Sequence, residues 1–351
     1  MSSDSKKAKP KKKNGRASLA MVAEHAGVSI ATASRIINGV TNKASKDTIL
    51  RVRASVEALN YRPASIGRAL RCQESRIVGL LAAAIENPAM AAIASSIEWA
   101  LRDEGYVLSL CDTHERADVQ DEYLLEMQSQ LARAVIIIGA VQSSVLDRMR
   151  EHGVSMLFVN RPDPGNFNSP YVGLDNYQAG VDIANCLTVR GLDRFGLIHA
   201  SLDATAATYR RQGVLDGMAQ AGIGPERILH FTTSDPNPLE VGYACMKTIL
   251  EMPDPPRVIL CMSDVLAYGA QRRVVEAGLD PVRDFAFFGF DNNPINIWIA
   301  DWLNAVGVPV EGYGKACVAA LKAIWGDEGL SEPVYLPHIV RLSGFPFPGE
   351  A

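Results

Sequence analysis

The chain has 351 residues, 48% of them hydrophobic, and a formal net charge of −4. No apolar run is long enough to cross a membrane, no secretory signal opens the sequence, and the six cysteines show no metal-ligand spacing. These features exclude a membrane partner and a cysteine metal site, and they predict reduced thiols in a bacterial-type cytoplasm.

Positive charge is concentrated at the N-terminal end. Residues 1–72 carry 15 Lys and Arg against 4 Asp and Glu, a net of +11, whereas residues 73–351 carry a net of −15. A basic head on an acidic body is typical of a protein that binds DNA through the head alone, because counterion release dominates DNA affinity. The lysine run within residues 1–17 has no large apolar residue to fold with, so we expect a disordered tail that either binds DNA or only aids solubility.

Residues 19–38 predict two helices joined by a tight turn. Apolar residues recur at the spacing of one helix face from Leu19 to Ala26, Gly27 permits a sharp turn, and Ser29 can cap a second helix. The second helix has one apolar face and one small, polar face, which is the pattern of a helix-turn-helix whose second helix lies in the DNA major groove. The inward residues are Ala33, Ile36 and Ile37, and the outward ones are Ala31, Ser34, Arg35 and Asn38.

A third helix and a short hinge follow. The apolar stripe of residues 46–59 predicts the helix, and Asn60-Tyr61-Arg62-Pro63 then breaks the chain. Residues 63–71 form a segment too short to be a stable helix alone in water. We expect it to order on DNA, where Arg68 can meet the duplex and Leu70 can wedge between base steps from the minor groove.

Four motifs of the head and hinge occur in order: Ala26-Gly27-Val28-Ser29, Ser34-Arg35, Leu59-Asn60-Tyr61-Arg62-Pro63 and Arg68-Ala69-Leu70-Arg71. Together they resemble the lactose-repressor/galactose-repressor family of bacterial transcription regulators, and the resemblance extends more loosely to the C-terminus. It implies that the partners are double-stranded, pseudo-palindromic operator DNA, a small-molecule effector and a second copy of the chain in a homodimer. It also implies that Ile30, Ala31 and Arg35 read base edges, that Ser29, Thr32, Ser34 and Asn38 help to hold phosphates, and that Leu70 intercalates.

From residue 75 onward, short apolar runs alternate with amphipathic stretches, which predicts an α/β fold with parallel sheets. This body is longer than one such sheet usually needs, so we expect two lobes. The expected fold class is therefore α/β, with an N-terminal all-α helix-turn-helix head and, as the resemblance implies, two doubly wound lobes of the periplasmic-binding-protein type. Strands are expected at 77–85, 106–111, 134–138, 154–159, 195–199, 258–261 and 285–290.

The expected domains are a tail over 1–17, a helix-turn-helix domain over 18–62, a hinge over 63–74 and an effector-binding and dimerisation domain over 75–345. The resemblance implies three crossings between the lobes, which we place near 174–176, 291–304 and 327–333. Lobe one then spans about 75–174 and 304–328, and lobe two about 175–291 and 332–345, closed by a final strand over 335–342.

Polar residues follow most of the predicted strands. Ligands bind at the carboxyl ends of the strands in open α/β sheets, so Asn87, Asn160 and Asp264 are expected at one edge. Any one of them can instead be a helix cap or a solvated loop residue, but together they predict a cleft for a small hydroxylated or charged effector. The resemblance adds Arg210 and Asp291, which match the family's usual effector-holding residues.

The resemblance is incomplete at other effector positions. Thr208 stands where many members have a second arginine, and Asn237 where many have a ring-stacking aromatic residue. A sugar ring stacked on an aromatic face therefore requires Trp298, Trp302 or Tyr209. The effector is expected to be a sugar or a related metabolite.

A regulator, expected to be a repressor, explains head, hinge and body together. A solute-binding protein of the same fold would explain the body only, and a cleft enzyme would need catalytic groups that no motif supplies: the chain has no phosphate loop, no Gly-x-Ser-x-Gly elbow and no dinucleotide fingerprint. The six histidines are scattered. We therefore expect no catalytic residue, no metal, no cofactor, and a cytoplasmic, nucleoid-associated location.

Overall fold

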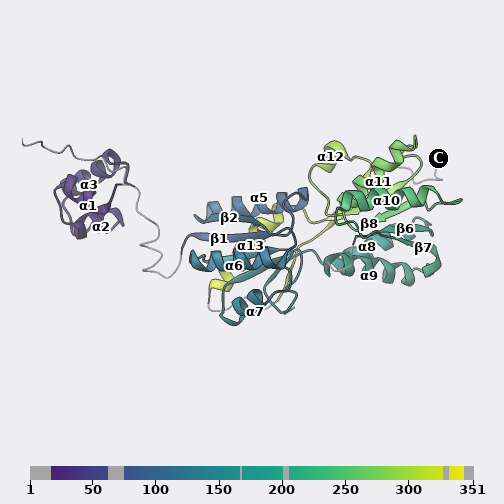
Figure 1. Ribbon diagram of the computed structural model, residues 1–351, viewed down its shortest axis with the longest axis horizontal. Coiled ribbons are helices and arrows are strands. Elements are labelled where there is room, and N and C mark those ends of the chain that lie inside the picture. Colours follow the sequence, from purple (N-terminus) through teal and green to yellow (C-terminus); the bar gives the residue numbers. More distant parts are fainter. Residues whose placement is uncertain (1–16, 62–74, 167, 201–204, 327–331, 344–351) are drawn as a thin grey trace, which may run out of the picture. The chain divides into compact units, whose positions relative to one another are not determined.

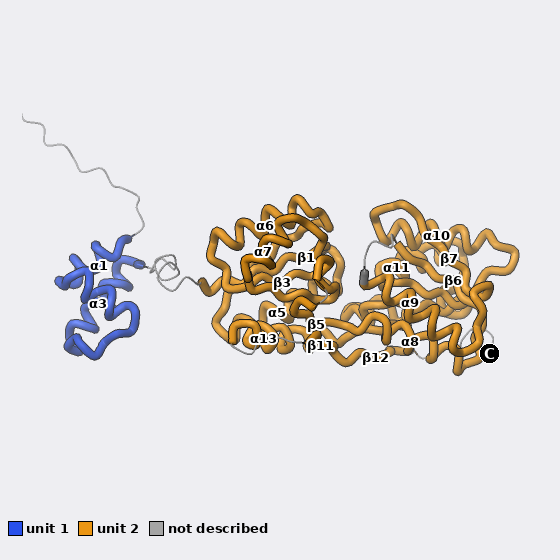
Figure 2. Tube along the Cα trace, turned by 90° about the horizontal axis from the view of Figure 1, so that it is seen from below, with its two compact units in different colours: residues 1–73 blue, residues 74–351 orange. Residues whose placement is uncertain are grey.

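The computed structural model describes residues 17–61, 75–166, 168–200, 205–326 and 332–343. The chain divides into two compact units, residues 1–73 and residues 74–351 (Figure 2). The first unit holds a helical head, and the second holds two lobes built on sheets. Two of the residues proposed to meet DNA, Arg68 and Leu70, lie outside the described residues.

The head consists of three helices, α1 (Leu19–Ala26), α2 (Ile30–Ile37) and α3 (Lys46–Ala58). Gly27 ends α1 with a φ of 65°, a left-handed conformation that strains any residue with a side chain. Ser29 caps α2 by accepting a hydrogen bond from the backbone N–H of Thr32 at 3.2 Å. The predicted helix-turn-helix is therefore confirmed. Its core is formed by Val22, Ala23, Ala26, Ala33, Ile36 and Val52.

Lobe one contains a six-stranded sheet of order β11-β5-β4-β3-β1-β2, in which every pair is parallel (Figure 1). The residues of β3 alternate between two cores, one shared with α5 and α13 and the other with α6 and α7, so helices cover both faces. The strands are β1 (Ile77–Ala82), β2 (Val107–Asp112), β3 (Ala134–Ile138), β4 (Met156–Val159), β5 (Tyr171–Gly173) and β11 (Val334–Tyr335). The helices are α5 (Pro88–Asp103), α6 (Ala117–Ser129), α7 (Ser144–Glu151) and α13 (Glu311–Trp325).

Lobe two repeats this order as β12-β10-β9-β8-β6-β7, with β12 antiparallel to β10 and the other pairs parallel. Helix α8 packs on α9 and α10 packs on α11 (Figure 1). The strands are β6 (Phe195–Ile198), β7 (Ile228–Phe231), β8 (Val258–Cys261), β9 (Ala286–Phe290), β10 (Leu303–Gly307) and β12 (Ile339–Arg341). The helices are α8 (Asn176–Thr188), α9 (Thr205–Gln220), α10 (Pro238–Leu250), α11 (Asp264–Glu276), the short α12 (Asn296–Ile299) and a 3-10 turn, η1 (Pro225–Arg227).

The two doubly wound lobes confirm the predicted fold class, and the first crossing lies where it was expected, between β5 and α8. The second crossing was placed too early. Residues Leu303–Gly307 form β10, which pairs with β9 of lobe two, so the chain leaves this lobe only after Gly307. The assignment of residues 304–307 to lobe one is therefore wrong.

The third crossing and the final strand also differ from the prediction. The segment predicted as one strand over 335–342 is two short strands in different sheets, because β11 pairs with β5 of lobe one and β12 pairs with β10 of lobe two. The N–H of Leu336 still donates to the carbonyl of Gly173 in lobe one, at 2.8 Å. The chain therefore crosses after Leu336, later than the expected 327–333.

Candidate functional site

The outer face of α2 is open to solvent. Ile30 is 55% exposed, and Ala31 and Arg35 are exposed beside it, whereas Ala33 and Ile36 are buried against the other two helices. No ion pair of Arg35 occurs among the described residues, so its guanidinium is available to a ligand. These positions fit the expected base-reading residues, whose role stays a prediction.

The residues expected to hold phosphates are ordered by contacts of their own. The hydroxyls of Ser29 and Thr32 lie 2.9 Å apart, and the side-chain amide of Asn38 donates to the carbonyl of Ser34 at 2.7 Å. These local bonds fix the side chains at both ends of α2 before any ligand arrives. The helix therefore presents a preformed polar rim around an apolar and cationic centre.

A cavity of about 490 Å³ lies between the two lobes, at the carboxyl ends of their strands. Four of the five expected effector residues line it: Asn87, Asn160, Arg210 and Asp291. The lobes thus bring together residues that are up to about two hundred positions apart in the sequence. The fifth, Asp264, does not line the cavity.

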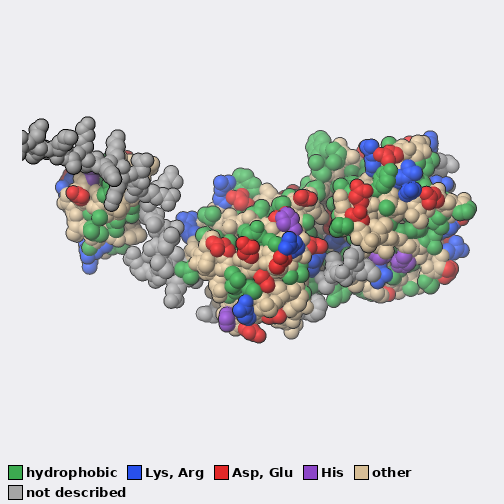
Figure 3. All heavy atoms as spheres, viewed as in Figure 1, with side chains coloured by type: hydrophobic (Ala, Val, Ile, Leu, Met, Phe, Trp, Pro, Cys, Tyr) green, Lys and Arg blue, Asp and Glu red, His purple; other side chains and the backbone are tan. Residues whose placement is uncertain are grey.

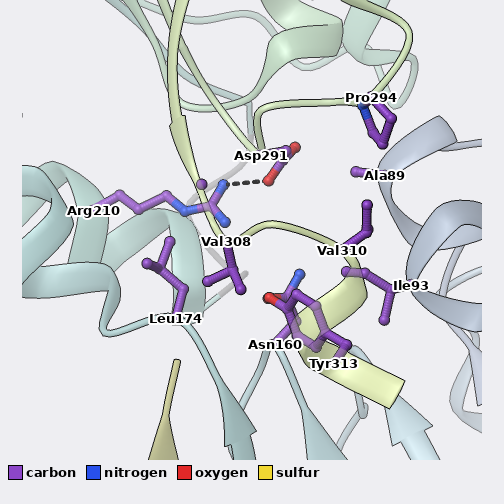
Figure 4. A pocket seen from close by; sticks show the side chains of 11 residues that line it. Ala89, Ile93, Asn160, Leu174, Arg210, Asp291, Pro294, Val308, Val310 and Tyr313 are labelled. Atoms are coloured by element: carbon purple, nitrogen blue, oxygen red, sulfur yellow. Dashed lines mark hydrogen bonds and ion pairs between the residues drawn. The ribbon is translucent and has the colours of Figure 1, made fainter. Parts of the chain in front are cut away.

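Arg210 is the most heavily bonded of these residues. Its Nη1 lies 3.0 Å from Oδ1 of Asp291 and donates to the carbonyl of Met262 at 3.0 Å, and its Nε donates to Oδ1 of Asn176 at 2.7 Å. The guanidinium also lies over the ring of Phe290, 5.0 Å from its centroid. These contacts fix the position of the guanidinium; its ion pair with Asp291 is drawn in Figure 4.

The close packing of α8 on α9 places Arg210 there. A side chain at Gly213 would overlap the backbone carbonyl of Tyr177, and one at Gly180 would overlap that of Arg210. Only glycine allows the two helices to approach this closely. Arg210 and Gly213 lie three residues apart in α9, so the glycine that allows the close packing also positions the arginine.

Three non-glycine residues that line the cavity have positive φ angles: Asn160 (65°), Glu115 (56°) and Asp291 (112°). Such conformations cost about 1–3 kcal/mol and gather where a site needs a particular geometry. Burial raises the pKa of Asp291, and Arg210 opposes this shift. Strain thus gathers at the ends of β2, β4 and β9, and at Asp291 it coincides with desolvation.

Asp264 has a different place from the one predicted. Ser263, not Asp264, caps α11, and the Asp264 carboxylate is 1% exposed. Its Oδ2 accepts hydrogen bonds from the N–H of Asn293 and the side chain of Asn296, both at 2.8 Å, while its buried Oδ1 has no partner in the described part of the chain. Asp264 therefore holds the loop that follows Asp291 and is not placed to contact an effector itself.

A second, smaller hollow adjoins the cavity and shares several lining residues with it. It has room for about one water molecule, at about 10 Å³, and is lined by Asn160, Arg210, Asp291 and Tyr313 (Figure 4). The Tyr313 hydroxyl donates to Oδ1 of Asn160 at 2.7 Å. This bond holds Asn160 toward the floor of the cavity.

A stacked sugar ring would need an aromatic face. Among the described residues, Tyr313 is the only aromatic residue that lines either hollow. Trp302 is buried against Phe287 and Tyr268, and Trp298 and Tyr209 are exposed without lining the cavity. Asn237, at the aromatic position, caps α10 instead.

Arg161 follows Asn160, lines the cavity and forms an ion pair with Glu115 at 2.9 Å. Sequence reasoning missed one group of lining residues. Thr233, Ser234 and Asp235 follow β7, a strand that was not predicted because it is short and only partly buried. Recognising β7 would have placed its loop at the same edge.

The described part of the chain contains no helix long and apolar enough to span a bilayer. Residues 18–64 match the model of "Bacterial regulatory proteins, lacI family", and residues 78–329 match that of "Periplasmic binding protein domain". The "HTH-type transcriptional repressor PurR" of Photorhabdus laumondii is 30% identical over 305 residues, which cover 86% of this chain and 88% of the relative.

Two solved structures share the fold. The lac repressor dimer bound to operator and the anti-inducer ONPF is 19% identical, with a TM-score of 0.81 over 93% of this chain and 98% of that one. A LacI family regulator from Enterococcus faecium with bound ribose is 21% identical, with a TM-score of 0.67 over 76% of this chain and 97% of that one.

Proposed function

The chain belongs to the lacI family of bacterial regulatory proteins, and from this premise we propose that it represses transcription by binding operator DNA through α2 and responds to a small molecule held between its lobes. The observation that carries the proposal is the convergence of Asn87 and Asn160 of lobe one with Arg210 and Asp291 of lobe two on one cavity. A ligand that touches both lobes favours one lobe angle, and any such preference is transmitted to the segment before Ile77, where lobe one begins.

At the DNA, Ile30, Ala31 and Arg35 read base edges, and Ser29, Thr32, Ser34 and Asn38 contact phosphates. An arginine side chain can grip guanine through two hydrogen bonds, and small apolar groups can contact thymine methyls. Arg68 and Leu70 of the hinge act in the minor groove. The exposure of α2 supports this assignment, as does Arg35, which has no ion pair with any residue that the structure describes.

The protein acts as a homodimer on a pseudo-palindromic operator, as the lac repressor of the similar structure does as a dimer on its operator. Exposed apolar side chains in both lobes support a surface for a second copy. They gather over α12, at Ile297, Trp298 and Ile299 (Figure 3), and on α5 and the edge strand β2, at Trp99, Val107 and Leu110.

The two alternative functions fit less well. A solute-binding protein has no use for a helix-turn-helix with a basic head, and the relatives matched over most of the chain are named as transcription regulators, not enzymes. We therefore assign no catalytic role to the cavity, and place the protein in the bacterial cytoplasm with its DNA.

The experiment that tests the proposed function is a genome-wide selection of DNA fragments by the purified full-length chain. The expected result is enrichment of a pseudo-palindromic sequence, followed by gel shifts of that sequence at 150 mM salt. Enrichment of no sequence, or of fragments bound equally well by an Arg35→Ala variant, would reject the regulator as assigned.

A further inference from the structure

The uncharged side chains Asn87, Asn160 and Ser263 offer the cavity free donors, because local contacts already use their acceptor oxygens. Oδ1 of Asn87 accepts from the N–H of Ala89 at 2.9 Å, Oδ1 of Asn160 accepts from Tyr313, and the Ser263 hydroxyl accepts from Leu266 at 3.4 Å. The side-chain NH2 groups of both asparagines have no partner among the described residues. A ligand for this cavity must therefore be rich in acceptors.

Two arginines add unused donors from opposite lobes. The Nη2 of Arg210 has no partner among the described residues, and Arg161 is bonded there only through Nη2, to Glu115. Their side chains are 7% and 15% exposed, so water reaches them poorly. Buried donors without acceptors are costly, more so when they are charged.

The least exposed ionisable side chains that line the cavity also carry more positive than negative charge. Arg161 and Arg210 face a single well-buried carboxylate, Asp291, which is 11% exposed. Glu115, which is 56% exposed, and Asp235, which is also exposed, line the cavity too, but solvent screens their charges. A neutral polyol can supply acceptors but cannot offset this excess charge, whereas a carboxylate or phosphate does both.

We propose that the effector is a small hydroxylated anion whose carboxylate or phosphate group is held by Arg161 of lobe one and Arg210 of lobe two. This inference rests on the proposed function, since it names the chemistry of the ligand for the same cavity. Because the two guanidiniums belong to different lobes, the anionic group is the part of the ligand that fixes the lobe angle.

The first test uses inorganic phosphate as the probe and the full-length chain. Thermal unfolding is followed at constant ionic strength, with chloride exchanged for phosphate. Phosphate also stabilises proteins nonspecifically, so the informative quantity is the difference between variants. Phosphate is expected to raise the Tm of the wild type and of Arg148→Gln, an exposed arginine on α7, more than that of Arg161→Gln.

Loss of phosphate binding in Arg161→Gln could also result from misfolding. A second variant that is expected to bind phosphate more tightly distinguishes the two explanations. Glu115→Gln deletes the exposed carboxylate that competes for Arg161, so phosphate affinity should rise about 2- to 5-fold. Equal phosphate shifts in the wild type, Arg161→Gln and Glu115→Gln would overturn the proposal.

The second test compares molecules that differ in one group: D-gluconate with D-glucitol, and glycerol 3-phosphate with glycerol. A bound anion at about 100 times its Kd should raise Tm by about 5–10 °C, and Arg161→Gln should weaken its binding by about 10-fold or more. The pair that responds identifies carboxylate or phosphate as the group. A neutral member that stabilises the wild type as strongly as its acid, or a panel with no shift that depends on Arg161, would overturn the proposal.

These outcomes separate the inference from the proposed function. A neutral ligand that changes operator affinity would overturn the anion assignment and leave the regulator intact. A phosphate shift that depends on Arg161, in a chain that selects no DNA sequence, would support the anion site and reject the regulator.

Discussion

Arg210 of α9 and Asp291 at the end of β9 form an ion pair inside lobe two, with Nη1 and Oδ1 3.0 Å apart and side chains 7% and 11% exposed. Removing one partner leaves a buried charge without its counterion, which costs about 3–5 kcal/mol. Asp291→Ala should therefore lower the free energy of unfolding by about that amount, measured by urea denaturation at pH 7.5. The double variant Arg210→Met/Asp291→Ala should lose less than the two single changes added together. A single-variant loss below about 1 kcal/mol would show that the pair is not desolvated in solution.

The pKa of Asp264 makes stability depend on pH. Burial, assisted by the charge of Asp291, raises this pKa to about 7. Between the ordinary value of 3.8 and about 7, the folded chain keeps a proton that the unfolded chain releases, so the free energy of unfolding falls as pH rises through this window. The full loss is reached above pH 7.

Asp264→Asn isolates this effect because the amide stays neutral and can still accept from Asn293 and Asn296. Its stability relative to the wild type should increase from pH 5 to pH 8, by at most about 1.4 kcal/mol per pH unit. Urea denaturation at four pH values measures the difference. Parallel curves for the two proteins would mean that Asp264 titrates normally.

The role of Arg35 can be separated from general DNA affinity. Arg35→Ala should cost about 1–3 kcal/mol of operator binding and relax preference at one base position, because a contact to a base edge is lost. Lys12→Ala should weaken operator and random DNA alike and flatten the salt dependence. Fluorescence anisotropy with both DNAs gives the ratio. An unchanged ratio in Arg35→Ala would place the reading face elsewhere.

If α12 lies in the dimer interface, a charged side chain introduced on this helix should weaken the dimer. Trp298 is 78% exposed, and Trp298→Glu should shift sedimentation toward the monomer at micromolar concentration. Val189, which is 80% exposed at the end of α8, provides the matched control, since Val189→Glu adds the same charge away from α12. Equal sedimentation of both variants and the wild type would exclude this surface from the interface.

The sequence predicted those strands and helices whose signals lie within their own residues. The bounds of β3 and β8 were predicted correctly because each is a short run of buried apolar residues. By contrast, β10 was read as a crossing. Its Asn304 looks like a loop residue, but the buried side chain donates to Phe287 and accepts from Ser343. These partners lie in β9 and after β12, so the residues next to Asn304 in the sequence do not indicate them.

The candidate site shows the same limit. Asn87, Asn160, Arg210 and Asp291 could be placed at one edge because each follows a strand or matches a family position. Asp264 could not be separated from them, since only the loop around Asn293 and Asn296 reveals that it holds Asp291's neighbours in place. The pairing of Arg161 with Glu115 likewise joins the ends of β4 and β2, which have no sequence proximity.

The last prediction connects the cavity to the DNA. If the ligand prefers one lobe angle and DNA prefers one arrangement of the segments that precede Ile77, each must change the affinity for the other by the same factor, typically about 5- to 150-fold. Arg161→Gln is expected to reduce this factor toward one, because lobe one then loses its charged contact with the ligand. Titrations of ligand with and without operator, and of operator with and without ligand, measure the factor in both directions. Two unequal factors would indicate a ligand that acts outside the cavity or on another oligomeric state, and an unchanged factor in Arg161→Gln would remove this arginine from the coupling.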